Sequence, residues 1–321
     1  MKKVVGFLML SLLAAPLVSA GGTKESAGGD TKLRIGFQKS SSLLILLKGA
    51  GTLEKALEPL GVTVEWNEFT SGLPMVEALN TGALDLSADV ADTVPLFAQA
   101  AGAEFTYFLE EKPSPTAEGI VVAKGSSINS LSELKGKKLA VAKASGAHYL
   151  TVAALNTVSL DFNKDIEVSY LQPADARTAL ESGNVDAWAT WDPYLATVQV
   201  QSGARIIADG AAVGVSYTRF YPIASAYAKR NPGVLKILAE ELTKIGKWVK
   251  DNPDEAARVH APLVGLNEET VKIANNRRSY AVSPVERSAL VEQQKIADLF
   301  IAGGLLAKPI TVSEVPVWDG K

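Results

Sequence analysis

The sequence predicts an α/β protein of two similar lobes, each a parallel, doubly wound sheet with helices on both faces. Three observations support this prediction: the length of 321 residues, the alternation of short apolar strands with helical segments, and the return of the same order of elements about a hundred residues later. A chain of this length commonly forms about two domains. Alternating strands and helices produce a parallel sheet that helices cover.

The first copy of the pattern follows the start of the globular region. Strands are expected at 33–37, 62–66 and 83–87, with helices at 43–57 and 73–80 between them. These short segments carry apolar residues at the spacing that strands and helices require.

The second copy repeats this order. Strands are expected at 138–142, 166–170 and 185–189, and helices at 145–157 and 174–181. Internal similarity of this kind indicates a duplicated unit.

One short segment aligns directly between the copies, because residues 79–85 and 180–186 share a Gly-x-hydrophobic-Asp ending. The chain beyond 217 is mostly helical, with helices expected at 232–250, 253–261, 267–277 and 284–301. These helices are needed to cover one lobe. Residues 32–115 with 217–321 are therefore expected to form lobe one, and residues 116–216 lobe two.

The N-terminus is expected to be a secretory signal peptide over residues 1–20. Lys2 and Lys3 precede a short apolar run, and small residues follow at 18–20. Residues 21–31 are rich in Gly, Ser and charge, as in a flexible tether. The chain has no cysteine to carry a lipid anchor, so an exported, soluble, periplasmic protein is expected.

Composition argues against several classes of function. With no cysteine and only His148 and His260, a thiolate or His-based catalytic or metal site is not expected. Removal of Lys2 and Lys3 leaves 30 basic and 35 acidic residues. An acidic protein of this kind is not expected to bind nucleic acid.

Ligands of open parallel sheets bind beyond the carboxyl ends of the strands, so four loops become candidates. Two of them place hydroxyl and backbone N–H groups at helix N-termini, where anions bind well. These loops contain Ser40, Ser41 and Ser42 in one copy and Ser145, Gly146 and Ala147 in the other. The alternative is ordinary helix capping, which favours serine everywhere.

The third candidate loop contains Trp191 and Asp192, followed by Pro193. Asp-Pro is typical of an N-cap and first helical residue. Trp188 is expected in the core, whereas Trp191 fits either the core or an aromatic wall of the ligand cleft.

The fourth loop carries Asp89 and Asp92. Paired carboxylates suggest acid–base chemistry, but no nucleophile accompanies them, and Asp92 before Thr93 also suits a cap. A carboxylate here could instead meet a ligand ammonium. Arg219 could bind a ligand anion, although a surface charge is the favoured interpretation, and the pair 277–278 is expected to be structural, at a helix end.

Taken together, several segments resemble the aliphatic sulfonate-binding proteins of ATP-driven (ABC) importers, within the wider group for taurine, nitrate and thiamine precursors. They are residues 34–39, 51–55, 97–103, 134–138, 148–150, 173–177, 185–188, 191–194, 276–280 and 292–298.

The resemblance implies a type II periplasmic-binding fold, with two lobes joined by two hinge strands. It also implies a small anionic ligand, an ABC permease of the inner membrane as partner, action as a monomer, no cofactor and no catalysis. Matching positions imply a cleft lined by Gln38, Ser40, Ser41, Ser42, Asp92, Thr93, Ser145, Gly146, Ala147, His148, Trp191 and Asp192.

The loop 87–91 departs from the family pattern by one extra residue and the added carboxylate of Asp89. Asp89 is therefore a candidate for selecting a zwitterionic aminosulfonate over an alkanesulfonate. Alternatives on the same fold are a nitrate, bicarbonate or thiamine-pyrimidine ligand, an enzyme of thiamine-pyrimidine synthesis, or a ligand-sensing partner of a receptor. The enzyme reading is weak, because those enzymes rely on a cysteine-rich stretch.

Overall fold

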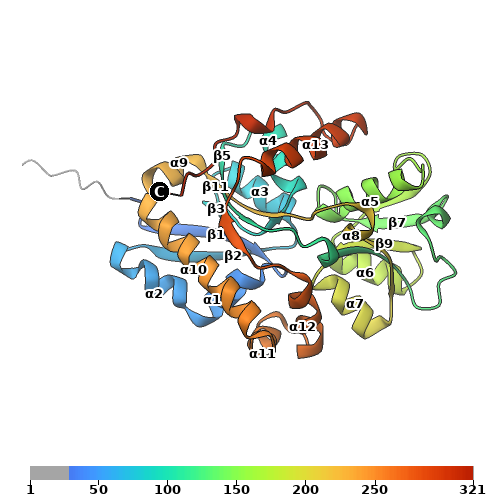
Figure 1. Cartoon of the computed structure of the whole chain (residues 1–321), viewed down its shortest axis with the longest axis horizontal. Helices are drawn as coiled ribbons and strands as arrows, with labels where there is room; N and C mark the ends of the chain where they lie inside the picture. The colour runs from blue at the N-terminus through green and yellow to red at the C-terminus, as the bar shows by residue number, and fades with distance from the viewer. Residues whose placement is uncertain (1–28, 321) are drawn as a thin grey trace, which may run out of the picture.

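Two α/β lobes lie side by side in the computed structural model, which describes residues 29–320 (Figure 1). The expected signal peptide, residues 1–20, and residues 21–28 of the expected tether lie outside the described residues. Within residues 29–320, no helix is long and apolar enough to cross a membrane.

The first sheet has seven strands in the order β12-β5-β11-β3-β1-β2, with β4 paired to β11. The strands are β1 (Lys32–Gln38), β2 (Thr63–Phe69), β3 (Leu86–Ser87), β4 (Val90–Ala91), β5 (Phe105–Glu111), β11 (Arg219–Ala224) and β12 (Val282–Pro284). β1 runs parallel to β2 and β3, whereas β11 runs antiparallel to β3, β4 and β5. This sheet is therefore mixed, not wholly parallel as predicted.

The second sheet has five strands in the order β10-β6-β9-β7-β8. They are β6 (Glu118–Val122), β7 (Lys138–Val141), β8 (Glu167–Tyr170), β9 (Ala187–Trp191) and β10 (Arg205–Asp209). β7 is parallel to β8 and β9, and β6 is antiparallel to β9 and β10. The chain passes between the lobes after β5 and before β11. In each sheet the strands on either side of these passages, β5 and β11 or β6 and β10, are antiparallel to each other.

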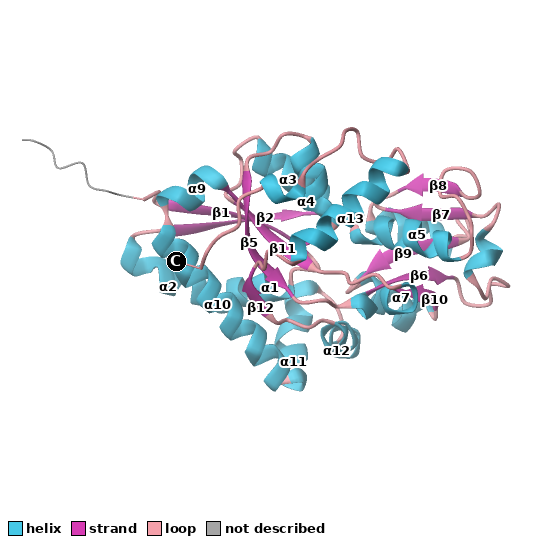
Figure 2. Ribbon diagram, turned by 45° about the horizontal axis from the view of Figure 1, so that its top comes forward, coloured by secondary structure: helices cyan, strands magenta, loops and turns pink. Residues whose placement is uncertain are grey.

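Helices cover both faces of each sheet (Figure 2). The first sheet carries α1 (Ser42–Ala50), α2 (Thr52–Leu57), α3 (Gly72–Asn80), α4 (Thr93–Ala100), α9 (Ser225–Arg230), α10 (Pro232–Asp251), α11 (Pro253–Val264) and α13 (Ala289–Ala302). The second carries α5 (Gly146–Thr157), α6 (Pro173–Glu181), α7 (Tyr194–Ser202) and α8 (Gly210–Val213). α12 (Glu268–Arg277) lies below the junction of the two lobes, where its last residue reaches α7.

Three predicted elements differ from the structure for local reasons. The helix expected over 43–57 divides at Gly51, whose φ of 62° ends α1 and precedes α2. The strand expected over 83–87 contains only Leu86–Ser87, and the helix expected from 284 begins at Ala289 because Val282–Pro284 forms β12.

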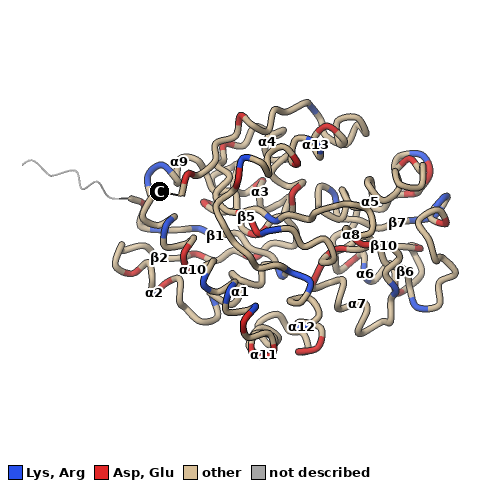
Figure 3. Tube along the Cα trace, in the orientation of Figure 1, with Lys and Arg blue, Asp and Glu red and all other residues tan. Residues whose placement is uncertain are grey.

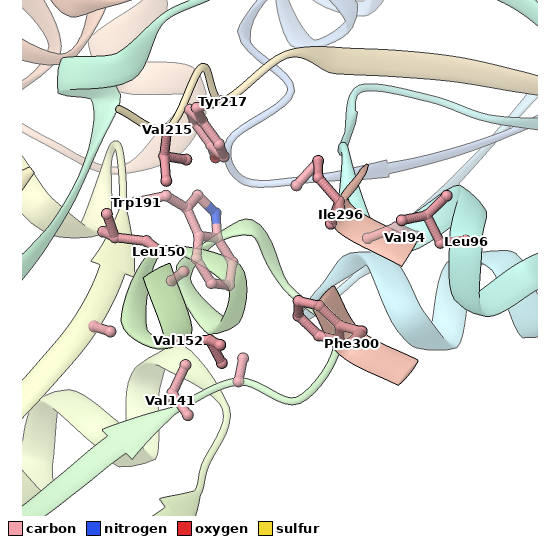
Figure 4. Close-up of a cluster of buried hydrophobic side chains, with 14 of the residues drawn as sticks. Val94, Leu96, Val141, Leu150, Val152, Trp191, Val215, Tyr217, Ile296 and Phe300 are labelled. Atoms are coloured by element: carbon pink, nitrogen blue, oxygen red, sulfur yellow. The ribbon is translucent and has the colours of Figure 1, made fainter. Parts of the chain in front are cut away.

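The core has one cluster in each lobe and one that spans their junction. Every second residue of β1 from Leu33 to Phe37 is buried in the lobe-one cluster. Leu33, Ile35 and Phe37 share this cluster with apolar residues of α1 and α10. The spanning cluster joins α4 and α13 of lobe one to α5 and β9 of lobe two (Figure 4). Buried apolar surface of this kind favours contact between the lobes.

Candidate functional site

The two lobes touch across the ends of their strands. Thr93 Oγ1, at the start of α4, donates a hydrogen bond to the carbonyl oxygen of Ala144, 2.8 Å away in lobe two. Arg277 Nη1 lies 3.3 Å from Asp192 Oδ1 and forms a second contact between the lobes. Thr93 and Ala144 belong to the loops that the sequence predicted to meet.

Arg219 lies inside lobe one, at the start of β11, with 1% of its surface exposed. Its Nε donates to Asp89 Oδ1 at 2.5 Å, and its Nη2 donates to Ser40 Oγ at 3.3 Å and to the Asp89 carbonyl oxygen. Its Nη1 donates to the Tyr217 hydroxyl. The interpretation of Arg219 as a surface charge is therefore wrong.

A second arginine completes this network. Arg278 is 3% exposed; its Nη2 lies 2.9 Å from Asp89 Oδ1, and it forms two hydrogen bonds of 2.8 and 2.7 Å to Glu111. Its Nη1 donates to the Ser40 carbonyl oxygen at 3.1 Å. Two guanidinium groups and two carboxylates thus pair with one another, as buried charges require.

These contacts give Asp89 partners other than the ligand ammonium expected from the sequence. Its carboxylate accepts from both arginines, and its backbone has a φ of 58°. Left-handed backbone is uncommon outside glycine and concentrates at functional sites. Ala144 and Tyr217, which lie at the junction, also adopt it.

The serine loop before α1 folds back on itself. Ser41 Oγ accepts from Gln38 N at 3.1 Å and forms no cap hydrogen bond to α1. Gln38 Nε2 donates to the Asp89 carbonyl oxygen at 3.1 Å. Ser40, Ser41 and Ser42 are all buried, and the N–H of Ser42, the first residue of α1, donates to the Ser40 carbonyl oxygen at 2.9 Å.

In lobe two, Ser145 is a helix cap: its Oγ accepts from His148 N at 3.2 Å. Gly146 faces the junction so closely that an added Cβ would stand 2.6 Å from Tyr217 Cε2 and 2.8 Å from Glu118 Oε2. Ala147 is fully buried in the spanning cluster. The close approach explains why glycine occupies position 146.

His148 lies apart from the arginine network. Its ring packs near Phe162, Tyr170 and Phe300, with centroids 5.0 to 5.6 Å away, and its Nδ1 accepts from Ala144 N. Burial, with the charge of Lys143, lowers the pKa of His148 to about 4. The side chain is therefore neutral at pH 7.

The end of β9 brings one further residue, Trp191, to the junction. Trp191 is 4% exposed and lies beneath Tyr217 and Val215 (Figure 4), while Trp188 is in the core as predicted. Trp191 Nε1 and Thr190 Oγ1 have no hydrogen-bond partner among the described residues. Both groups can donate to an anion.

Asp192 caps α7 differently from the prediction. Its Oδ1 accepts from Ala196 N at 2.9 Å, but Pro193 precedes the helix, which begins at Tyr194. Burial raises the pKa of Asp192 to about 6, and Arg277 opposes this shift.

Sequence reasoning missed Glu118, at the start of β6. Glu118 is fully buried, and neither of its carboxyl oxygens has a hydrogen-bond partner among the described residues. Burial, followed by the negative charge of Asp92, raises its pKa well above the usual value. Little in the sequence indicated this burial, because a single glutamate that follows a proline-rich segment is ordinarily expected to be exposed.

Asp92, in contrast, was among the residues that the sequence predicted to line the cleft, and it is 2% exposed. Its Oδ1 accepts from Thr93 N at 2.9 Å. Burial raises its pKa to about 7, against the lowering effects of the hydrogen bond from Thr93 and the charge of Arg219. Figure 3 shows that charged residues of both signs lie along both lobes, including near the junction.

The architecture, two α/β lobes that close around polar loops at their strand ends, defines a solute-binding protein of the type II periplasmic-binding fold. A family model described as NMT1-like matches residues 26–264. The chain belongs to the NMT1-like family.

Relatives and solved structures agree with this assignment. A protein of Escherichia coli (strain K12) named as an aliphatic sulfonates-binding protein is 36% identical over 288 residues, 89% of this chain and 88% of that protein. A protein of Bacillus subtilis (strain 168) with the same name is 32% identical over 311 residues, 96% of this chain and 93% of that protein. The alkanesulfonate-binding protein SsuA from Xanthomonas axonopodis pv. citri, bound to MOPS, is 34% identical with a TM-score of 0.85, over 90% of this chain and 99% of that one.

Proposed function

We propose that this protein is the substrate-binding component of an ABC importer and captures a small aliphatic sulfonate between its lobes. The observation that carries the proposal is an unpartnered, buried donor at the junction. Trp191 Nε1 has no partner among the described residues, and it lies at the end of β9, beside the lobe-two loop that touches Thr93 across the junction. Buried donors of this kind suit an oxyanion.

The relatives support the ligand class. Two proteins named for aliphatic sulfonates match about nine tenths of the chain, and the similar SsuA structure was solved with a sulfonate buffer molecule. In this proposal the sulfonate oxygens meet the donors at the start of α1, α4 and α5, with Trp191 as an aromatic wall. Ser40 and Arg219 support this surface from behind.

Delivery to an inner-membrane permease, export to the periplasm and action as a monomer complete the proposal. A binding role without turnover is favoured over catalysis, because the relatives that are more than 30% identical over most of the chain are binding proteins. Desulfinases from Rhodococcus match only 42% of the chain, at 24% identity.

A melting screen tests the ligand class. Taurine, alkanesulfonates, sulfate, nitrate, bicarbonate and a thiamine-type pyrimidine are added in turn at concentrations up to 1 mM in a phosphate buffer. A ligand at a hundredfold excess over Kd adds about 2.7 kcal/mol to the free energy of unfolding. We expect shifts with sulfonates; shifts with nitrate or the pyrimidine alone would contradict the proposal.

A further inference from the structure

The charges at the junction do not balance, and the imbalance bears on which sulfonate the protein prefers. The guanidinium groups of Arg219 and Arg278 are paired with Asp89 and Glu111. Two positive and two negative groups cancel, so this network has no cation left for another carboxylate.

Two more carboxyl groups, Asp92 and Glu118, lie beside the network and form no ion pair within residues 29–320. Asp92 is 2% exposed and accepts backbone hydrogen bonds from Thr93 and Thr218. Glu118 is fully buried, and both of its oxygens lack a hydrogen-bond partner among the described residues. A buried carboxylate without a partner is costly, so these two groups require a proton or a cation.

Geometry places Glu118 at the junction of the lobes, on the same sheet face as Trp191. Glu118 pairs directly with Trp191 across β6 and β9, and directly paired residues project to the same face of a sheet. Its Oε2 approaches Gly146 at the start of α5. Trp191 Nε1, an independent donor that is buried and unpartnered, lies on the same face.

Asp92 lies on the lobe-one side of the junction, directly before α4. It lines a cavity of about 250 Å3 together with Tyr149, Thr218 and Phe220. Burial, and then the charges of Asp92, Glu292 and Glu118, raise the pKa of Tyr149, which lies close enough to both carboxyl groups to feel their charge. Burial raises the pKa values of Asp92 and Glu118 despite the opposing charge of Arg219, in agreement with two carboxyl groups that form no ion pair among the described residues.

We propose that Asp92 and Glu118 form a cation subsite for the ammonium group of the ligand, so that the preferred ligands are small sulfonates that also carry a protonated amine. This inference rests on the proposed function. A sulfonate alone adds a negative charge beside two carboxyl groups, whereas an aminosulfonate adds both charges and satisfies donors and carboxylates together.

Two ligands of the same size and shape test the subsite. Taurine and propane-1-sulfonate differ by one ammonium in place of a methyl group, and isothermal titration in phosphate buffer at pH 7.5 gives both Kd values. We expect the wild-type protein to bind taurine at least tenfold more tightly. In Glu118→Gln, this ratio is expected to fall at least tenfold, through weaker taurine binding.

Asp85→Asn is the matched control. It also removes a buried carboxylate, but Asp85 pairs with Arg34 at the opposite end of β1, so the ratio should not change. Asp92→Asn provides a second test of the subsite if Glu118→Gln fails to fold, with the same expected fall.

The outcomes separate the two proposals. Equal affinity of the wild-type protein for both ligands, or a ratio that both carboxyl variants leave unchanged, overturns the cation subsite while sulfonate binding stands. Absence of binding by either sulfonate overturns the proposed function, and the subsite with it.

Discussion

Thr93 Oγ1 donates a hydrogen bond to the carbonyl oxygen of Ala144, 2.8 Å away, and so joins the first turn of α4 in lobe one to the loop before α5 in lobe two. Both residues are fully buried. A hydrogen bond between lobes exists only while they are in contact, so it contributes to closure rather than to the folding of either lobe. Thr93 also stands among the residues expected to meet the ligand.

Thr93→Val removes this donor while keeping the shape of the side chain. Because the Ala144 carbonyl then loses its partner in the closed form, we expect sulfonate affinity to fall about two- to tenfold, as one hydrogen bond contributes about 0.5–1.5 kcal/mol. Isothermal titration measures the loss. Thr93→Ser keeps the hydroxyl and should bind almost as well as wild type, and Thr197→Val, which loses a bond within α7, should not change affinity.

Arg277→Met is expected to loosen the other contact between lobes. Arg277 lies 3.3 Å from Asp192 and donates to Gln199 at 2.6 Å, so its charge links α12 to α7. Small-angle scattering of the unliganded variant should give a larger radius of gyration, and affinity should fall a few-fold. Arg258→Met, which breaks an exposed pair within α11, serves as control. A variant with wild-type scattering and affinity would show that this contact does not govern closure.

Asp89→Asn is expected to destabilise the fold without altering ligand preference. The substitution leaves Arg219 and Arg278 buried with Glu111 as their remaining carboxylate, and breaking a buried ion pair costs about 3–5 kcal/mol. Urea unfolding measures this loss. The ratio of taurine to propane-1-sulfonate affinity should stay at the wild-type value, unlike that of Glu118→Gln.

For comparison, Asp254→Asn removes an exposed partner of Lys272 and should change the free energy of unfolding by less than about 1 kcal/mol. A changed ligand ratio in Asp89→Asn would instead assign the ammonium contact to Asp89, as the sequence suggested.

The stability of the protein should depend on the proton held by Asp92. Its pKa is raised from 3.8 to about 7 in the folded state, chiefly by burial. Between pH 4 and 7 the native state therefore retains a proton that the unfolded chain has lost, so the free energy of unfolding falls as pH rises. Above pH 7 this contribution is lost and the curve levels.

Asp92→Asn isolates this effect. Urea unfolding at pH 4.5, 6 and 7.5 should show the stability of wild type falling relative to that of the variant, by at most about 1.4 kcal/mol per pH unit. His148 and His260, whose pKa values burial lowers to about 4, act in the opposite direction but are present in both proteins. Glu118 and Arg219, which lie near position 92, are likewise present in both the wild-type protein and the variant. A constant difference between the two proteins would contradict the prediction.

Local signals in the sequence were sufficient for many elements. Ser145 caps the N–H of His148 three residues on, and Asp192 accepts from Ala196 four residues on, so each contact depends on neighbours in the chain. The repeated order of strands and helices likewise follows from short-range patterns. The helix division at Gly51 was missed because glycine inside an apolar run does not by itself fix a left-handed backbone.

The charge network was beyond sequence reasoning. Arg219 and Asp89 are 130 residues apart, and Arg278 and Asp89 are 189 apart. Nothing near Arg219 in the chain indicates burial, because the carboxylate that neutralises it, Asp89, lies in the turn between β3 and β4. Glu118 was missed for the same reason: its burial depends on Tyr217 and α5.

The sequence by itself determined the two α/β units, the loops at their strand ends and the resemblance to sulfonate-binding proteins, because periodicity, caps and motifs act over a few residues. Only the tertiary structure decided which charges meet. Pairing Asp89 with two arginines, and leaving Asp92 and Glu118 outside any ion pair among residues 29–320, requires strands and helices from distant parts of the chain to pack together. Burial then turns an ordinary glutamate into a group that needs a proton or a positively charged ligand.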